Sequence, residues 1–383
     1  MTNKFNFTPT GIGSLPHQDP VKACELILKN LPGIPFWPQL PQRDFKEGMA
    51  TQFSEGLPGL STDREKKKIY FDTANKNSPE ELANFYQHYL NKNLDYFAIS
   101  PDYVPGLYKM LDLLKMDKNR PAIFIKGQIT GPITWGLAVT DETGQAIIHN
   151  EIIADVMVKN LAMKALWQIN LFANTLNLSV SPPRFAWRGR GGGSVPPGRG
   201  GKPIIFIDEP SLMGYGSAYS PLTSEMVTKY LGEIIETIHP TGSLVGIHCC
   251  GNTDWSLLLE LPVDIISFDA YGFMDKFLLY ADDIKKFINR GGVIAWGIVP
   301  VTLEDRRVEE TFRSPEFITD LTKRIYIAID TLVKKGIDKE RILNQSLLTP
   351  SCGMGMRTEA EAEKLLSILG QTSQKVGEFF NLS

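Results

Sequence analysis

The sequence predicts an α/β protein of the (β/α)8 class, a TIM barrel formed as a single domain by residues 1–383. Eight short apolar runs rich in β-branched residues alternate with longer segments whose apolar residues recur at helical spacing. Eight parallel strands close such a barrel, and a chain of 383 residues can hold one with insertions. No GxGxxG motif, which would favour an open dinucleotide-binding sheet, follows the first run.

The predicted strands are spread along the whole chain. They are residues 8–14, 95–100, 122–128, 204–210, 244–250, 264–270, 292–299 and 341–351. Amphipathic segments at 78–93, 224–240 and 314–336 predict helices between them. Strands that alternate with helices pair in parallel, so the carboxyl ends of all the strands should open on one face, where barrels carry their active sites.

Two segments depart from this alternation. Residues 15–80 include IPFWPQLPQRDF and SEGLPGLS, and we expect them to form an elaborated loop over the barrel mouth. Residues 179–203 hold four arginines, one lysine, no acid and many glycines and prolines, which predicts a flexible insertion before the fourth strand. Phe185 and Trp187 in this insertion would suit single-stranded RNA. However, the insertion enters its strand at the face opposite the expected active site.

The composition is that of a globular protein, with 43% hydrophobic and 22% charged residues. A net charge of −3 gives no general attraction to nucleic acid or to an anionic membrane, so neither is an expected partner. No apolar stretch is long enough to cross a bilayer, and the first residues lack the apolar core of a signal peptide. Four cysteines do not predict a disulfide framework, so the expected location is the reducing cytoplasm.

Two of the four cysteines follow a histidine at the end of the fifth predicted strand. Side chains two residues apart in a strand point the same way, so His248 and Cys250 project toward one point while Cys249 turns away and packs as a small apolar residue. Cys352 follows the eighth predicted strand, which opens on the same face. One imidazole and two thiolates predict a zinc site with an open fourth position, as catalytic zinc has. The alternative is a buried, hydrogen-bonded histidine beside inert cysteines.

Acidic residues end several other predicted strands. Asp208 and Glu209 close the fourth strand, Asp269 closes the sixth, and Asp102 follows the second. Asp269 is a candidate fourth zinc ligand, and Asp208 is a candidate to hold a substrate ammonium group. Each could instead cap the following helix, which is a common role of aspartate. His17, after the first strand, could donate a hydrogen bond to the substrate or to a bound donor molecule, and the alternative is an ordinary loop histidine.

Five stretches carry a resemblance to a known family: TGIGSLPH, KGQITGPIT, IDEP, HCCGN and TPSCG. In this order they resemble the catalytic barrel of cobalamin-independent methionine synthase, here in a single-barrel form. The superfamily of that barrel also holds uroporphyrinogen decarboxylase and the corrinoid-to-thiol methyltransferases. The stretches span nearly the whole chain, and the HxC pair with the distant cysteine is the most specific element.

The resemblance implies roles for individual residues. It implies that His248, Cys250 and Cys352 bind zinc, and it places Asp269 where the family has a glutamate ligand. In the family, the IGS stretch and the aspartate of IDEP bind the amino-acid part of homocysteine, and Asp102 matches a family glutamate only loosely. The candidate substrate-binding residues are Ile12, Ser14, Asp102, Asp208 and Glu209, and the candidate catalytic residues are His17 and Asp208.

The activity that the resemblance implies is zinc-dependent transfer of a methyl group to a thiol, such as homocysteine, to give a thioether such as methionine. The expected cofactor is Zn²⁺. The expected donor is a methyl-corrinoid, free or carried on a corrinoid protein, or methyl-tetrahydrofolate. One alternative is a non-catalytic barrel that binds zinc, a corrinoid or a thiol. The other is a uroporphyrinogen-decarboxylase-like lyase, although the arginine-rich segment of that enzyme near the first strand is absent here.

Overall fold

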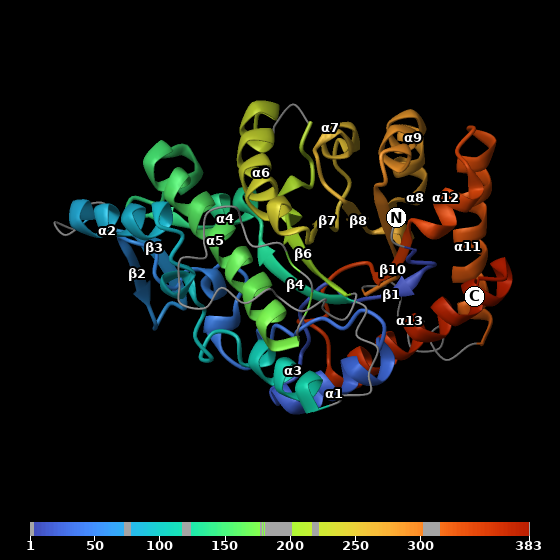
Figure 1. Ribbon diagram of the computed structural model, residues 1–383, viewed down its shortest axis with the longest axis horizontal. Coiled ribbons are helices and arrows are strands. Elements are labelled where there is room, and N and C mark those ends of the chain that lie inside the picture. Colours follow the sequence, from blue (N-terminus) through green and yellow to red (C-terminus); the bar gives the residue numbers. More distant parts are fainter. Residues whose placement is uncertain are drawn as a thin grey trace.

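The computed structural model describes residues 4–72, 78–116, 124–176, 178, 180, 201–216, 222–301 and 315–382. A curved sheet of seven strands lies at the centre, with helices around its outer side (Figure 1). Within these ranges, no helix has both the length and the apolar character needed to cross a membrane. The parallel sheet and the helices around it confirm the α/β class that the alternation of strands and helices predicted.

Every strand of the central sheet pairs in parallel with its neighbours, in the order β1-β10-β9-β8-β7-β6-β4. The strands are β1 (Thr8–Pro9), β4 (Phe124–Thr130), β6 (Lys202–Asp208), β7 (Leu244–Cys249), β8 (Ile265–Phe268), β9 (Val293–Val299) and β10 (Ser346–Pro350). Seven of the eight predicted strands thus contribute to one parallel sheet whose carboxyl ends share a face, as expected for this class.

The prediction of a strand at residues 95–100 is wrong. Residues Leu94–Phe97 form a 3-10 helix, η3, because their apolar side chains pack outward against helices: the ring of Phe97 lies 5.5 Å from that of Phe85 in α2. The space between β1 and β4 is instead bridged by residues 35–39. Isolated parallel bridges pair Phe36 with Lys126 of β4 and Gln39 with Ser14 after β1.

Residues 35–39 escaped prediction because they contain two prolines, Pro35 and Pro38, which cannot donate to a sheet ladder. Their carbonyl and amide groups still pair on both sides. The amide of Lys126 donates to the carbonyl of Pro35 at 2.9 Å, and the amide of Leu15 donates to the carbonyl of Gln39 at 2.8 Å. The segment predicted as an elaborated loop at 15–80 therefore includes residues that bridge the two edges of the central sheet.

The rest of residues 15–80 is more ordered than a simple loop. Helix α1 (Pro20–Asn30) begins with the carboxylate of Asp19 capping the amide of Val21 at 2.8 Å. Further along, strands β2 (Leu60–Asp63) and β3 (Lys68–Phe71) form an antiparallel hairpin, which β5 (Thr140–Asp141) extends in parallel. This three-stranded sheet lies beside α2 at one end of the molecule (Figure 1).

The helices cover the outer side of the central sheet, and those predicted at 78–93, 224–240 and 314–336 are confirmed. Besides α1, they are α2 (Ser78–Leu90), α3 (Pro105–Met116), α4 (Pro132–Ala138), α5 (Glu151–Leu176), α6 (Ser224–Ile238), α7 (Trp255–Glu260), α8 (Ala270–Phe277), α9 (Ala281–Asn289), α11 (Pro315–Lys334), α12 (Lys339–Asn344) and α13 (Glu359–Phe380). Because α12 occupies residues 339–344, the strand predicted at 341–351 begins later than expected.

Of the predicted insertion at 179–203, residues 179 and 181–200 lie outside the described ranges.

One end of the barrel interior is filled by apolar side chains. Alternate residues of the strands point inward and pack together, and with neighbouring side chains they form one cluster: Phe5, Ile34, Phe124, Ile204, Phe206, Ile265, Val293, Ala295 and Leu347. Further along the same strands toward their carboxyl ends, the inward positions become polar, with Lys126 and Gln128 on β4 and Asp208 on β6. The chemistry of the interior is therefore concentrated near the mouth.

Candidate metal centre and active site

Three residues that are far apart in the sequence meet at the carboxyl ends of β7 and β10. His248 lies near the end of β7, Cys250 directly follows that strand, and Cys352 follows β10. One ligand atom from each of the three lies within 4.8 Å of the other two. This arrangement results from the parallel sheet, in which both strands end on the same face.

Strand alternation places the two adjacent cysteines in different surroundings. Cys249 is completely buried in the hydrophobic core, and burial raises the pKa of its thiol to about 12. Cys250 and Cys352 are only partly buried. A hydrogen bond from Cys352 lowers the pKa of Cys250, and the same bond raises that of Cys352. The two partly buried thiols thus lie close enough to affect each other's pKa, whereas Cys249 is packed in the core, as predicted.

The imidazole of His248 is held from one side. Its side chain is 2% exposed, and its Nδ1 atom lies 3.0 Å from the hydroxyl oxygen of Ser267 on β8. Its Nε2 atom is buried without a hydrogen-bond partner. A buried ring nitrogen with no partner beside two thiols is the donor set that zinc prefers. The serine on the other ring nitrogen holds the orientation of the imidazole, and when Nδ1 donates to the Ser267 hydroxyl, Nε2 is free to bind a metal.

Asp269 caps a helix beside this group. Its carboxylate accepts a hydrogen bond from the amide of Gly272 at 2.8 Å and forms the N-cap of α8. Burial raises the pKa of this carboxyl group, and the nearby amides lower it. In the described part of the chain, Asp269 is not one of the residues whose ligand atoms lie within 4.8 Å of one another. In this structure Asp269 therefore caps a helix, which is the alternative role that the sequence offered for it.

Asp208, at the end of β6, faces the interior next to His248, with which it pairs in the sheet register. Its side chain is 6% exposed, and Oδ1 is buried without a hydrogen-bond partner. Burial raises the pKa of Asp208 to about 6, against the opposing effect of the charges of Lys126 and His248. A buried carboxylate oxygen with no protein partner is suited to accept a hydrogen bond from a ligand.

Glu209, the next residue, points to the other side of the strand. Its carboxylate accepts hydrogen bonds from the amides of Ile133 and Thr134 at 2.9 and 2.7 Å and from the Thr134 hydroxyl at 2.7 Å. These donors lie in the first turn of α4, so Glu209 satisfies the start of that helix. Burial raises its pKa to about 7, and the three hydrogen bonds oppose that rise. Its contacts are thus within the protein, while its predicted role in substrate binding stays a prediction.

The two candidates after β1 lie in a segment that links the interior to the Cys352 loop. The carbonyl oxygen of Ile12 accepts a hydrogen bond from the ammonium group of Lys126 at 2.5 Å. Ser14 accepts a hydrogen bond on its hydroxyl from the amide of Gly355 at 3.1 Å and one on its carbonyl from the amide of Met354 at 2.9 Å. Ser14 is therefore close to the turn that carries Cys352.

His17 lies further along the same segment. Its side chain is 1% exposed, its Nδ1 atom has no hydrogen-bond partner, and burial lowers its pKa. The charged groups that act on it are Glu359, Glu363, Asp19 and Lys22, at the starts of α13 and α1. No cluster residue is among these groups, so its predicted catalytic role stays a prediction.

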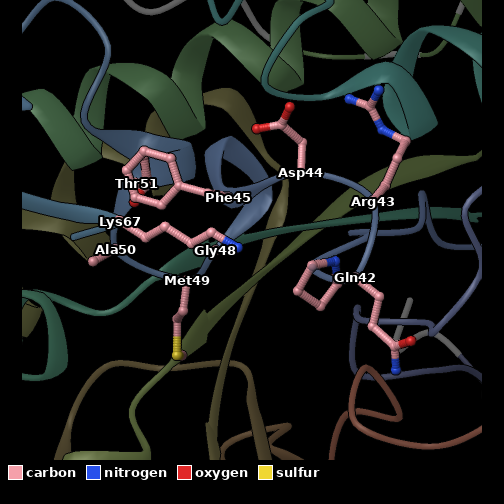
Figure 2. A pocket seen from close by; sticks show the side chains of 10 residues that line it. Gln42, Arg43, Asp44, Phe45, Gly48, Met49, Ala50, Thr51 and Lys67 are labelled. Carbon is pink, nitrogen blue, oxygen red and sulfur yellow. The ribbon is translucent and has the colours of Figure 1, made fainter. Parts of the chain in front are cut away.

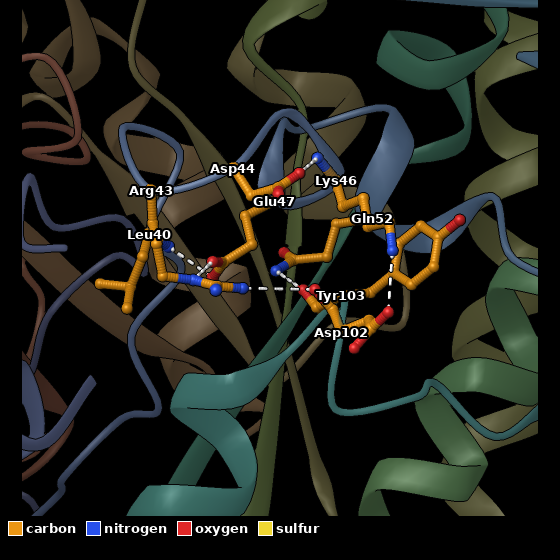
Figure 3. Close-up of polar contacts among 8 residues, drawn as sticks. All are labelled: Leu40, Arg43, Asp44, Lys46, Glu47, Gln52, Asp102 and Tyr103. Carbon is orange, nitrogen blue, oxygen red and sulfur yellow. Dashed lines mark hydrogen bonds and ion pairs between the residues drawn. The ribbon is translucent and has the colours of Figure 1, made fainter. Parts of the chain in front are cut away.

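Asp102 lies on the surface. Its carboxylate forms an ion pair with Lys46 at 2.9 Å, and its side chain is 74% exposed (Figure 3). The hydrogen bond to Lys46 lowers its pKa. Its backbone carbonyl also accepts a hydrogen bond from Arg43 at 3.3 Å, and Arg43 in turn pairs with Glu47. This pairing ties the segment at 43–47 to the segment at 102–103, which is a structural role independent of any ligand.

A pocket of ≈ 320 Å³ lies beside this segment (Figure 2). Residues 41–45 and 48–51 line it together with Lys67. Two of its lining residues are bonded to β4 and α4: the carbonyl of Met49 accepts a hydrogen bond from the hydroxyl of Thr130 at 2.5 Å, and the carbonyl of Ala50 accepts one from the indole of Trp135 at 2.7 Å. Among its lining residues there is none of the predicted site residues.

Two residues of the site were not predicted from the sequence, although strand alternation could have indicated both. Ser267 stands two residues before Asp269 and therefore faces the same side as that carboxylate. Lys126 is a charged residue in the middle of an otherwise apolar run, FIKG, where a lysine is rarely placed without a partner.

No protein-family profile and no curated protein match this sequence. Solved structures match its fold over nearly the whole chain. A B12-independent methionine synthase from Shewanella sp. W3-18-1, in complex with selenomethionine, matches with a TM-score of 0.53 at 14% identity, over 98% of this chain and 99% of that one. A methyltransferase from Methanosarcina mazei matches with a TM-score of 0.51 at 14% identity, over 95% and 87% of the two chains. The resemblance predicted from the five stretches is thus confirmed at the level of fold, which this chain shares with a B12-independent methionine synthase and a methyltransferase.

Proposed function

We propose that this protein is a zinc-dependent methyltransferase that transfers a methyl group to the thiol of homocysteine or a similar compound, giving a thioether such as methionine. The observation that carries the proposal is the approach of His248, Cys250 and Cys352 to within 4.8 Å at the mouth of the barrel. The names of the structural neighbours, a methionine synthase and a methyltransferase, support the reaction class.

The three residues fit zinc by their chemistry. Two sulfurs and one imidazole leave a fourth position for a substrate, which is the arrangement of catalytic zinc. Zinc held there would lower the pKa of a bound thiol and present it as a thiolate, the nucleophilic form. Ser267 would hold the imidazole of His248 in the orientation that binds the metal, with Nδ1 donating to its hydroxyl oxygen. The partial exposure of Cys250 and Cys352 would leave the site open to substrate.

The amino-acid part of the thiol would be bound by the neighbouring strand ends. Asp208 offers an unpartnered carboxylate oxygen to a substrate ammonium group. Within the described part of the chain, the backbone amides of Gly13 and Ser14 donate to no backbone or side-chain acceptor, so they can bind a carboxylate. A thiol held at both ends would be oriented for attack on the methyl group of the donor, which lowers the entropic part of the barrier.

Metal analysis and a transfer assay on the same preparation test the proposal. We expect about one zinc per chain, as one cluster of three ligands would hold. We also expect methylation of homocysteine with methylcobalamin or with methyl-tetrahydrofolate. The compound that supports the reaction identifies the class of methyl donor. Full activity in metal-free protein would refute the mechanism. Zinc binding without turnover would support a non-catalytic binding barrel, and release of CO₂ from a carboxylated substrate without a zinc requirement would support a lyase.

A further inference from the structure

A lysine lies inside the barrel, below the candidate substrate site. Lys126 is on β4, and its side chain is 0% exposed. Its ammonium group lies 4.4 Å from the centre of the Phe206 ring, on the adjacent strand β6. Placing a charged ammonium in a barrel interior costs free energy unless other groups compensate for it. The position therefore requires a reason.

The hydrogen bonds of Lys126 reach two segments that form the site. Its ammonium donates to the carbonyl of Ile12 at 2.5 Å and to the side-chain oxygen of Gln128 at 3.2 Å. Gln128 then donates to the carbonyl of Trp37 at 3.0 Å, in the segment that bridges β1 and β4. One side chain thus joins the strand that leads to Ser14 with the segment that closes the sheet.

The bond to Ile12 also sets the direction of the next amide. In a trans peptide the carbonyl of one residue and the N–H of the next point in opposite directions. Because the carbonyl of Ile12 points to Lys126, the N–H of Gly13 points away from it. A carbonyl that is polarised by an ammonium group makes the N–H of the same peptide a stronger donor.

Asp208 provides the opposite charge. Lys126 lies on β4, the strand adjacent to β6, and its charge lowers the pKa of this carboxyl group while burial raises it. Phe206 lies two residues before Asp208 on the same side of β6, so the ammonium over its ring lies below the carboxylate. Lys126 therefore supports both polar ends of the proposed substrate site.

We propose that Lys126 is a positioning residue that makes the site selective for thiols carrying an α-amino and an α-carboxylate group. It acts without touching the substrate, by orienting the Ile12–Gly13 peptide and by balancing the charge of Asp208. The inference rests on the proposed function, because it concerns the acceptor of that same reaction.

The test compares homocysteine with 1-propanethiol, which has the same reacting end but neither charged group. For Lys126→Met we expect kcat/KM with homocysteine to fall about tenfold or more, since a charged hydrogen-bonding group is lost, while that with 1-propanethiol stays within about threefold. Lys126→Gln keeps a donor for the carbonyl of Ile12 without the charge, so its loss should be intermediate. Two further thiols separate the contributions of the two charged groups. 4-Mercaptobutanoate keeps the carboxylate and lacks the amino group, and 3-amino-1-propanethiol keeps the amino group and lacks the carboxylate.

The chain offers a matched control in Lys164 of α5. This lysine is also 0% exposed, its ammonium has no hydrogen-bond partner, and the charge that acts on it is that of Glu55. Lys164→Met removes an equally buried charge, so it should leave the ratio of homocysteine to 1-propanethiol activity unchanged. Zinc content and thermal unfolding are measured for every variant to show that the metal site and the fold are retained.

The possible results are distinguishable. Equal losses with both thiols in Lys126→Met, or the same change of ratio in Lys164→Met, would overturn the role of Lys126. If the wild type methylates 1-propanethiol with the same kcat/KM as homocysteine, the proposed thiol methylation is supported but the proposed selectivity is wrong. If the wild type methylates no thiol, the proposed function fails and this inference fails with it.

Discussion

The Nδ1 atom of His248 lies 3.0 Å from the hydroxyl oxygen of Ser267, its register partner on the adjacent strand β8. The other ring nitrogen, Nε2, is buried without a partner, and the ring is in the cluster with Cys250 and Cys352. Ser267 therefore orients the imidazole toward the position where a metal would bind. The hydrogen bond is a direct consequence of strand register, because paired residues in adjacent strands point to the same side.

Ser267→Ala removes the partner of Nδ1 and leaves the three candidate ligands in place. We expect zinc affinity to fall about 10- to 100-fold, as is typical when a group that orients a ligating histidine is lost. Competition with a chromophoric chelator measures this affinity. Ser256→Ala, on α7, is the control because the hydroxyl of Ser256 bonds to Asp254 rather than to a cluster residue. Equal zinc affinity in the wild type and Ser267→Ala would show that the contact does not orient the ring.

The two adjacent cysteines should respond differently to substitution. Cys250→Ala and Cys352→Ala each remove one of three ligands, so we expect each to lose zinc and thiol methylation together. Cys249→Ala should keep its zinc, because that thiol is packed in the core, and it should lose stability by about 1 kcal/mol for the smaller buried group. Metal content by mass spectrometry separates the three variants. Retention of zinc in Cys352→Ala would contradict the proposed ligand set.

The two aspartates predicted to bind substrate occupy different environments, and this leads to opposite expectations. Asp208→Asn removes a buried charge beside the cluster, so we expect the KM for homocysteine to rise about tenfold or more. Asp102 is 74% exposed and pairs with Lys46 on the surface, so Asp102→Asn should leave the kinetics nearly unchanged. Steady-state assays over a range of homocysteine concentrations measure both. A large effect at Asp102 would mean that the 43–47 segment moves onto the substrate.

The contact between Gly131 and Glu209 predicts a stability effect. A Cβ atom on Gly131 would lie 2.1 Å from Cδ of Glu209, whose carboxylate is fixed to the first turn of α4. Gly131→Ala should therefore destabilise the fold by about 1–3 kcal/mol through overpacking. Gly232→Ala, within α6, meets nothing within 4 Å and should instead stabilise it by about 0.5–1 kcal/mol. Denaturant unfolding measures both, and equal effects would rule out the clash as the cause.

His17 predicts a dependence of stability on pH. Burial lowers its pKa from the ordinary value of 6.5 in the folded state, so the unfolded chain binds a proton more readily. The contribution of neutral His17 is therefore present above pH 6.5 and is lost as the pH falls through the lowered folded value. Relative to His17→Gln, the wild type should lose free energy of unfolding between about pH 7 and pH 5. Parallel curves for the two proteins would show that His17 titrates normally in the fold.

The sequence was sufficient to predict most of the architecture, because buried parallel strands are short apolar runs and outer helices have an apolar face. It failed where those signals were misleading. Residues 95–100 are apolar enough for a strand but use Phe97 to pack on α2, and residues 35–39 bridge β1 and β4 despite two prolines. Local pattern does not say which of two candidate segments reaches the gap in a sheet, since that depends on partners distant in the chain.

For the site, the sequence by itself determined which side chains share a face: alternation separated Cys249 from the His248–Cys250 pair, and parallel pairing brought Cys352 to the same end. The tertiary structure alone decided what each acidic residue contacts. It placed Asp208 inside the barrel above Lys126, attached Glu209 to α4, made Asp269 a helix cap, and left Asp102 on the surface. Facing direction follows from the local backbone period, whereas a contact depends on the packing of elements that are distant in sequence.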